Sequence, residues 1–162
     1  MGLVPSTIAS NDLVSVEQEL VDIYRRAYSS MPFYAYTKQV EIEHYLHWLK
    51  RRAREGFLVA HVGPRPVGFI AVDDSWHTWY GEEVGEIHEF VVDPAFQGRG
   101  IGKQLLRAGI EFLREHGARR IELWVGEKNE KAQGFYRREG FWEEGKWGKW
   151  IRMLKDLARE GA

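Results

Sequence analysis

Three alternating glycines stand where an apolar run of the sequence gives way to a helical pattern. They belong to the segment Gln97-Gly98-Arg99-Gly100-Ile101-Gly102-Lys103, which follows Val91 and Val92. The N-terminus of a helix presents unpaired backbone N–H groups and a partial positive charge, and glycine lets a ligand approach them because it has no Cβ. Arg99 and Lys103 add cationic side chains. The segment therefore predicts a binding site for a diphosphate.

Two common phosphate-binding loops do not fit this segment. A nucleotide P-loop requires Gly-Lys followed by Ser or Thr, whereas Gly102-Lys103 is followed by Gln104. A dinucleotide-binding loop requires G-x-G-x-x-G, but the glycines here are spaced G-x-G-x-G, and no suitable acidic strand end follows. The remaining interpretations are a different anion-binding loop, which the helix behind it favours, and a plain strand-to-helix turn.

A second patterned segment follows after one more expected strand. Asn129 is a good N-cap for a short helix on which Ala132 and Tyr136 share one face. Gly140 and Phe141 suit a Schellman ending, with Phe141 packing back near Tyr136. A core helix explains most of this pattern, but it does not explain why position 136 is a tyrosine rather than another large apolar residue.

The elements that must position these segments alternate between helices and strands. We expect helices from Ser15 and from Thr37 towards Glu55, strands at 57–62, 67–72, 84–92 and 120–125, a polar aromatic loop at 75–83, helices at 103–116 and after Asn129, and a hairpin over 141–155. Residues 1–14 fit either a short strand or a loose arm. The crossover at 84–125 requires a parallel strand pair, so the fold class is α/β.

Length and composition indicate one ordinary globular domain over residues 1–162. Hydrophobic residues make up 44% and charged residues 29%, and the net charge of −1 does not suggest nucleic-acid binding. The absence of cysteine excludes disulfides, thiolate metal sites and a cysteine nucleophile. His44 and His47 have no evident third ligand, so no metal site is expected. Without a membrane-spanning run or a secretory signal, we expect a cytoplasmic protein with no membrane partner.

Taken together, the two motifs resemble those of the GCN5-related N-acetyltransferase (GNAT) family. Gln97 to Gly102 matches Q/R-x-x-G-x-G/A, the family's acetyl-CoA pyrophosphate loop, and Asn129 to Phe141 is similar to N-x-x-A-x-x-L/F-Y-x-x-x-G-F. The resemblance is strong over about residues 84–155 and covers only the element order in the first 56 residues. It implies the GNAT fold, a mixed and mostly antiparallel sheet flanked by helices, with one parallel strand pair splayed to admit acyl-CoA.

The resemblance also implies direct transfer of an acetyl group from acetyl-CoA to a primary amine of a small molecule, peptide or protein. Tyr136 is the family-matched proton donor to the leaving thiolate. The residues expected to bind acetyl-CoA lie on the first parallel strand, the glycine loop and the second motif: Phe90, Val91, Val92, Gln97, Gly98, Arg99, Gly100, Ile101, Gly102, Lys103, Asn129 and Tyr136.

The identity of the catalytic base stays open between three neighbouring residues. Glu86 lies eleven residues before Gln97, which is the spacing of the base in histone-type members of the family. Glu89 and His88 are the rivals. In a regular strand Glu86 and His88 share one face and Glu89 takes the other, and a β-bulge would change that parity. Glu86 is slightly favoured over Glu89, and His88 comes third.

Aromatic residues gather in two expected loops, where exposed apolar surface needs an explanation. They are Phe33, Tyr34, Tyr36, Trp76, Trp79 and Tyr80. An acceptor pocket and a homodimer contact explain them equally well. The alternative to an enzyme is a catalytically silent module that binds acyl-CoA as a sensor, and Tyr136 together with the acids at 86 and 89 favours the enzyme.

Overall fold

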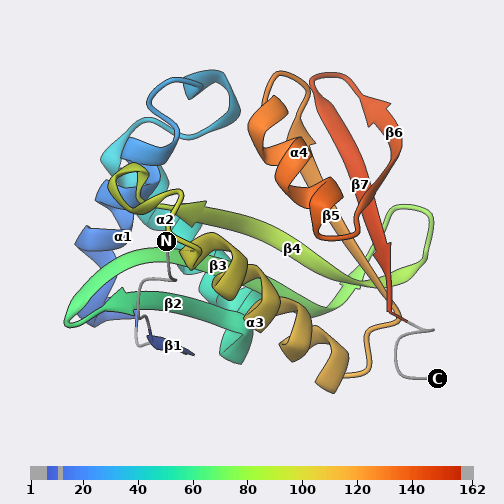
Figure 1. The fold of residues 1–162 in the computed structure, drawn as a ribbon, viewed down its shortest axis with the longest axis horizontal. Coiled ribbons are helices and arrows are strands. Elements are labelled where there is room, and N and C mark those ends of the chain that lie inside the picture. The colour runs from blue at the N-terminus through green and yellow to red at the C-terminus, as the bar shows by residue number, and fades with distance from the viewer. Residues whose placement is uncertain (1–6, 11–12, 158–162) are drawn as a thin grey trace.

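The computed structural model describes residues 7–10 and 13–157, whose strands form one seven-stranded mixed sheet (Figure 1). The strands are β1 Thr7–Ser10, β2 Phe57–Val62, β3 Arg65–His77, β4 Glu83–Val92, β5 Arg120–Gly126, β6 Trp142–Trp147 and β7 Trp150–Asp156. Their order across the sheet is β1-β2-β3-β4-β5-β7-β6. Within the described strands only β4 and β5 pair in parallel. The expected sheet, mixed and mostly antiparallel with one parallel strand pair, is confirmed.

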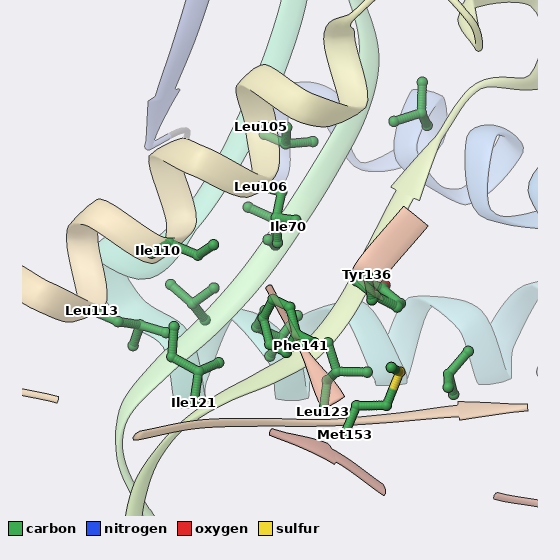
Figure 2. Close-up of a cluster of buried hydrophobic side chains, with 14 of the residues drawn as sticks. Ile70, Leu105, Leu106, Ile110, Leu113, Ile121, Leu123, Tyr136, Phe141 and Met153 are labelled. Atoms are coloured by element: carbon green, nitrogen blue, oxygen red, sulfur yellow. The ribbon is translucent and has the colours of Figure 1, made fainter. Parts of the chain in front are cut away.

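Helices cover both faces of the sheet, and each side has its own core. The helices are α1 Leu13–Ala27, α2 Gln39–Ala53, α3 Ile101–Glu115 and α4 Glu130–Arg138, with short 3₁₀ turns at Pro32–Tyr34, Arg54–Gly56 and Pro94–Phe96. One core packs α1 and α2 against β2 to β4. The other packs α3 against the opposite face, where Leu106 and Ile110 lie near Ile70 (Figure 2). In the described part of the chain, no helix combines the length and apolar character needed to cross a bilayer.

The second motif folds as its residue types predict. The Asn129 side chain accepts a hydrogen bond from the Ala132 N–H at the start of α4. At its end, Gly140 has a φ of 94°, and the Phe141 N–H donates to the Tyr136 carbonyl at 3.0 Å. The rings of Tyr136 and Phe141 are 5.8 Å apart, which completes the Schellman arrangement. Tyr136 is thereby held in the core with Phe141 (Figure 2).

Two expected helix starts differ from the structure. α1 begins at Leu13, so Ser15 lies inside the helix instead of capping it. α2 begins at Gln39 after Lys38, and no side chain caps it, so Thr37 is not its cap. The packing of both amphipathic helices on the sheet supplies stability that does not depend on a cap.

In the first half of the chain, the structure decides one strand that the sequence left open and lengthens another. Residues 7–10 form β1, which pairs antiparallel with β2. β3 continues to His77, because Trp76 pairs with Val84 and His77 with Glu83 across the β3–β4 hairpin. Trp76 therefore lies in a strand and not in the expected loop. Polar residues on the exposed end of a strand resemble a loop in sequence, which explains the difference.

The parallel pair is short and then opens. Its ladder consists of Gly85↔Ile121, Glu86↔Glu122 and Ile87↔Leu123. Beyond these pairs β4 follows β3, while β5 stays paired with β7 as far as Gly126. The strands therefore separate towards the end that faces the glycine loop.

Candidate active site

A cavity of about 800 Å³ lies where β4 and β5 separate. Ten of the predicted cosubstrate residues line it: Phe90, Val91, Val92, Gln97, Gly98, Gly100, Gly102, Lys103, Asn129 and Tyr136. Arg99 and Ile101 do not. The guanidinium of Arg99 stacks over the Phe96 ring at 5.1 Å, and Ile101 is fully buried in the core beneath α3.

The glycine loop has the backbone shape expected of an anion cradle. Gly98 and Gly100 have φ values of 77° and 83°, and Gly100 occupies the N-cap position of α3 without a capping side chain. The Gln97 amide donates to the Val92 carbonyl and accepts from Lys131, both at 3.0 Å, which fixes the loop to the end of β4. The unpaired N–H groups of the α3 N-terminus thus stay available to a diphosphate.

A second cavity of about 600 Å³ lies beside the first and is lined mostly by aromatic side chains. Phe33, Tyr34 and Tyr36 line it, as expected of an acceptor pocket. The two cavities share six residues: Tyr28, Tyr34, His88, Glu89, Trp124 and Trp150. Two ligands entering by separate cavities would therefore meet beside Glu89.

Glu89 is held by two phenols at this junction. The Tyr28 hydroxyl donates to Oε2 at 2.5 Å, and the Tyr45 hydroxyl donates to Oε1 at 2.9 Å. Burial raises the pKa of the Glu89 carboxyl, and the hydrogen bonds from Tyr28, Tyr45 and the Phe90 N–H offset only part of that rise. A carboxylate with a raised pKa is a stronger base than an exposed glutamate, which suits proton abstraction near neutral pH.

Glu86 lies outside both cavities. The residue is only 3% exposed and sits against Glu122, whose carboxylate accepts a hydrogen bond from Arg152. Burial and the adjacent Glu122 raise the pKa of Glu86 well above its usual range, although Arg152 lowers it in part. Glu86 therefore holds its proton more tightly than an exposed glutamate does, inside a buried charge cluster.

A β-bulge at His88 decides which acid reaches the cavity. Ala71 of β3 pairs with Glu89 and Val72 pairs with Ile87, so His88 is an extra residue without an opposite partner. The bulge reverses the parity of the strand beyond it. The regular alternation considered in the sequence therefore does not hold across His88, and Glu89 faces α1 and α2 beside the cavity.

Tyr136 lines the same cavity as Glu89. Within the described part of the chain its hydroxyl has no hydrogen-bond partner, although a structural tyrosine of the core usually has one. Burial and then the charge of Glu89 raise the pKa of this phenol. Tyr136 therefore keeps its proton at neutral pH and can donate it.

Sequence reasoning missed several residues of the site. Tyr28, Trp124 and Trp150 line the cavities without having been singled out, and neither was Tyr45, which lines the second cavity from the apolar side of α2. A hydroxyl on the otherwise apolar side of this helix was the signal that could have identified Tyr45. Among the expected loop aromatics, Trp79 and Tyr80 stay 71% and 58% exposed, so a homodimer contact through them stays a prediction.

His47, one of the two histidines on α2, has a carboxylate partner. His47 contacts Glu17 at 2.8 Å on the outer side of α1 and α2. Across residues 7–10 and 13–157, no group of three or more His, Asp or Glu side chains is arranged to hold a metal ion.

Comparison with known proteins places this geometry in a family. A model described as the acetyltransferase (GNAT) family matches residues 17–141. An uncharacterised N-acetyltransferase of Methanocaldococcus jannaschii is 42% identical over 140 residues, which cover 86% of this chain and 62% of that protein. The chain thus spans less than two thirds of that relative's length.

Solved structures agree with this match. A crystal structure of a Pyrococcus horikoshii protein has a TM-score of 0.87 and 41% identity, covering 94% of this chain and 99% of that one. The PaiA N-acetyltransferase of Thermoplasma acidophilum, solved with coenzyme A, has a TM-score of 0.75 over the same shares at 19% identity, so it is similar in fold. Acetyl-CoA is the cosubstrate of the family. From its family match and its fold, this chain belongs to the GNAT acetyltransferase family.

Proposed function

We propose that the chain transfers the acetyl group of acetyl-CoA directly to a primary amine. The observation that carries this proposal is the position of Glu89, which lines both cavities, together with Tyr136, which lines the first. Acetyl-CoA would occupy the first cavity with its diphosphate against Gly98 and Gly100. The amine would enter through the aromatic cavity and meet the thioester beside Glu89.

Glu89 supports the role of general base. An ammonium group has no lone pair, so it must lose a proton before it attacks the thioester. The raised pKa of Glu89 strengthens it as a proton acceptor. Tyr28 and Tyr45 hold both oxygens of the carboxylate in place, and burial raises the pKa of each phenol, so they remain hydrogen-bond donors.

Tyr136 supports the role of general acid. The thiolate of coenzyme A leaves more readily when it receives a proton, and the free hydroxyl of Tyr136 is a donor in the same cavity. Backbone N–H groups near Val91 would stabilise the oxyanion of the tetrahedral intermediate. No acyl-enzyme is required, in keeping with a chain that has no cysteine.

The acceptor we propose is a small primary amine or the N-terminus of a peptide. The aromatic cavity of about 600 Å³ is within the usual size range of ligand sites and ends at Glu89. Aromatic walls favour an apolar or extended group next to the amine, and a protonated amine is attracted to aromatic faces.

A direct test measures the release of free coenzyme A from acetyl-CoA with a panel of primary amines. The panel contains short peptides with free N-termini, their N-acetylated counterparts as matched controls, and aliphatic and aromatic amines. We expect turnover with at least one free amine and none with the blocked peptides. Tight acetyl-CoA binding without turnover of any amine would instead support the silent sensor.

A further inference from the structure

The bulge on β4 brings a second titratable side chain next to Glu89. His88 packs edge-on against Trp48 of α2 at 5.0 Å and Trp76 of β3 at 4.7 Å. Glu89 faces the same helices through its two tyrosine partners. Both residues therefore lie on the α1–α2 side of the sheet, and His88 lines both cavities. The acetyl-transfer chemistry described above does not use His88.

His88 is paired with a buried carboxylate. Its Nε2 lies 2.9 Å from Oδ2 of Asp73, and the two side chains are 8% and 0% exposed. Asp73 also accepts from the Ser75 N–H at 3.0 Å and from Nε of Arg52 at 2.9 Å. Burial would raise the pKa of Asp73, but these bonds and the one from His88 lower it to about 2. Asp73 is therefore a carboxylate at any pH near neutrality.

The charge of Asp73 fixes the tautomer of His88. A carboxylate only accepts hydrogen bonds, so Nε2 of His88 carries the proton that points to Asp73. The lone pair of the neutral ring is then on Nδ1, to which no described residue is hydrogen-bonded. Nδ1 is consequently the atom at which this ring gains and loses a proton.

The charges around His88 come from three elements. Asp73 contacts it from β3, and Arg52 of α2 is hydrogen-bonded to Asp73. Glu89 is the residue that follows His88 in β4. The Tyr45 hydroxyl of α2 bonds to Glu89 and lies 3.4 Å from the His88 carbonyl. Asp73 and Arg52 offset each other, and Asp73 stabilises an imidazolium when one forms.

We propose that Asp73 and His88 form a proton relay behind Glu89, an inference that rests on the proposed acetyl transfer to an amine. The nitrogen of an ammonium acceptor loses two protons during acetylation. One replaces the proton that Tyr136 gives to the thiolate of coenzyme A, and the second, which Glu89 takes up, is released as the net proton product. That second proton moves from Glu89 through water in the shared part of the cavities to Nδ1 of His88, and from the imidazolium to bulk water. His88 is thus the exchanging group, and Asp73 is a positioning residue.

The relay is tested with His88→Gln, whose amide can still donate to Asp73 but cannot take up a proton. With saturating acetyl-CoA and the amine that turns over fastest in the panel, we expect kcat to fall about 10- to 100-fold. This loss is smaller than the one expected when a general base is removed. The acidic limb of the kcat–pH profile should flatten, and acetyl-CoA affinity should stay unchanged. Asp73→Asn should cause a smaller fall in the same direction.

A second variant separates proton transfer from structure. His88→Ala should be rescued by imidazole added as a buffer, with the rate rising with the concentration of its neutral form. His47→Gln is the matched control, because His47 also contacts a carboxylate but lines neither cavity. It should keep the wild-type rate and pH profile.

Several outcomes would overturn the relay alone while the wild-type protein still acetylates its amine. They are a wild-type kcat and pH profile in folded His88→Gln, an effect on KM without one on kcat, or no imidazole rescue of His88→Ala. Nitrogen NMR of ¹⁵N-histidine-labelled wild-type protein gives a readout without an acceptor, and a His88 proton on Nδ1 in the neutral ring would also refute the relay. Absence of turnover with every amine would refute the proposed function, and the relay with it.

Discussion

The two halves of β4 carry carboxyl groups in contrasting surroundings. In the half that is still paired with β5, Glu86 lies against a second carboxylate and an arginine, away from both cavities. In the half that has separated from β5, Glu89 lies between two phenols beside open space. Burial raises the pKa of both groups. A raised pKa alone therefore does not identify a base, whereas access to a cavity and donors that fix the carboxylate do.

The largest expected effect comes from Glu89→Gln. Loss of a general base lowers kcat about 10²- to 10⁴-fold, and the glutamine keeps the volume of the side chain. Because a base works only when deprotonated, the wild-type rate should rise with pH through the raised pKa of Glu89, and this limb should disappear in the variant. Steady-state rates at saturating acetyl-CoA from pH 5 to 9 measure both effects. A larger loss in Glu86→Gln than in Glu89→Gln would reverse the comparison.

Tyr136→Phe tests the other side chain of the first cavity. It keeps the ring that packs against Phe141 and removes only the hydroxyl, which has no described hydrogen-bond partner. We expect a fall in kcat of about 10²-fold, with little change in acetyl-CoA binding. Turnover per folded molecule, with the folded fraction taken from a melting curve, is the quantity to compare. Wild-type turnover at every pH would leave solvent as the acid.

Gly100→Asp separates cosubstrate binding from the chemistry at Glu89. It adds a side chain and a negative charge at the N-cap of α3, where the diphosphate is expected, so the affinity for acetyl-CoA should fall about 100-fold. Isothermal calorimetry measures this loss. Gly117→Asp is the matched control, because Gly117 has a similar φ of 86° beyond the far end of α3. Equal losses in both variants would point to backbone strain instead of phosphate binding.

Glu86→Gln should have the smallest effect on the rate. It should also raise the stability of the protein. Because the pKa of Glu86 is raised in the folded protein, the folded protein keeps this proton above pH 4 while the unfolded chain releases it. Glu86 therefore lowers the free energy of unfolding, and this loss of stability grows as the pH rises from about 4 towards the raised pKa. A neutral glutamine removes this cost. Its melting temperature at pH 7 should exceed the wild-type value by about 2–4 °C for each kcal/mol gained, and the gain should vanish near pH 4. Thermal unfolding at the two pH values checks the sign, and kcat should stay near the wild-type value.

The motifs and the element order were predictable because local backbone demands dictate them. Gly100 needs a positive φ at a helix N-terminus, and Gly140 needs one at a helix end. These demands appear in the sequence at fixed spacings, so the loop, α4 and the parallel crossover were all anticipated.

The bulge and the convergence on Glu89 were not predictable in the same way. The bulge at His88 arises from the register between β3 and β4, which no local pattern encodes. Tyr28 and Tyr45 come from two different helices, and only tertiary packing brings their hydroxyls to one carboxylate. The Asp73–His88 pair likewise joins two strands, so its members look unrelated in the chain.

The three-pair ladder between β4 and β5 also makes this seam the least tethered part of the central sheet. The flanking ladders have eight pairs between β3 and β4 and seven between β5 and β7. Local opening should therefore begin here, and amide hydrogens of residues 88–92 and 124–126 should exchange faster than those of β3. If the pantetheine arm of acetyl-CoA pairs with β4, the cosubstrate supplies the ladder hydrogen bonds that β5 does not make there. Saturating acetyl-CoA should then slow exchange at these residues first, so that the enzyme is most ordered when it is loaded for reaction.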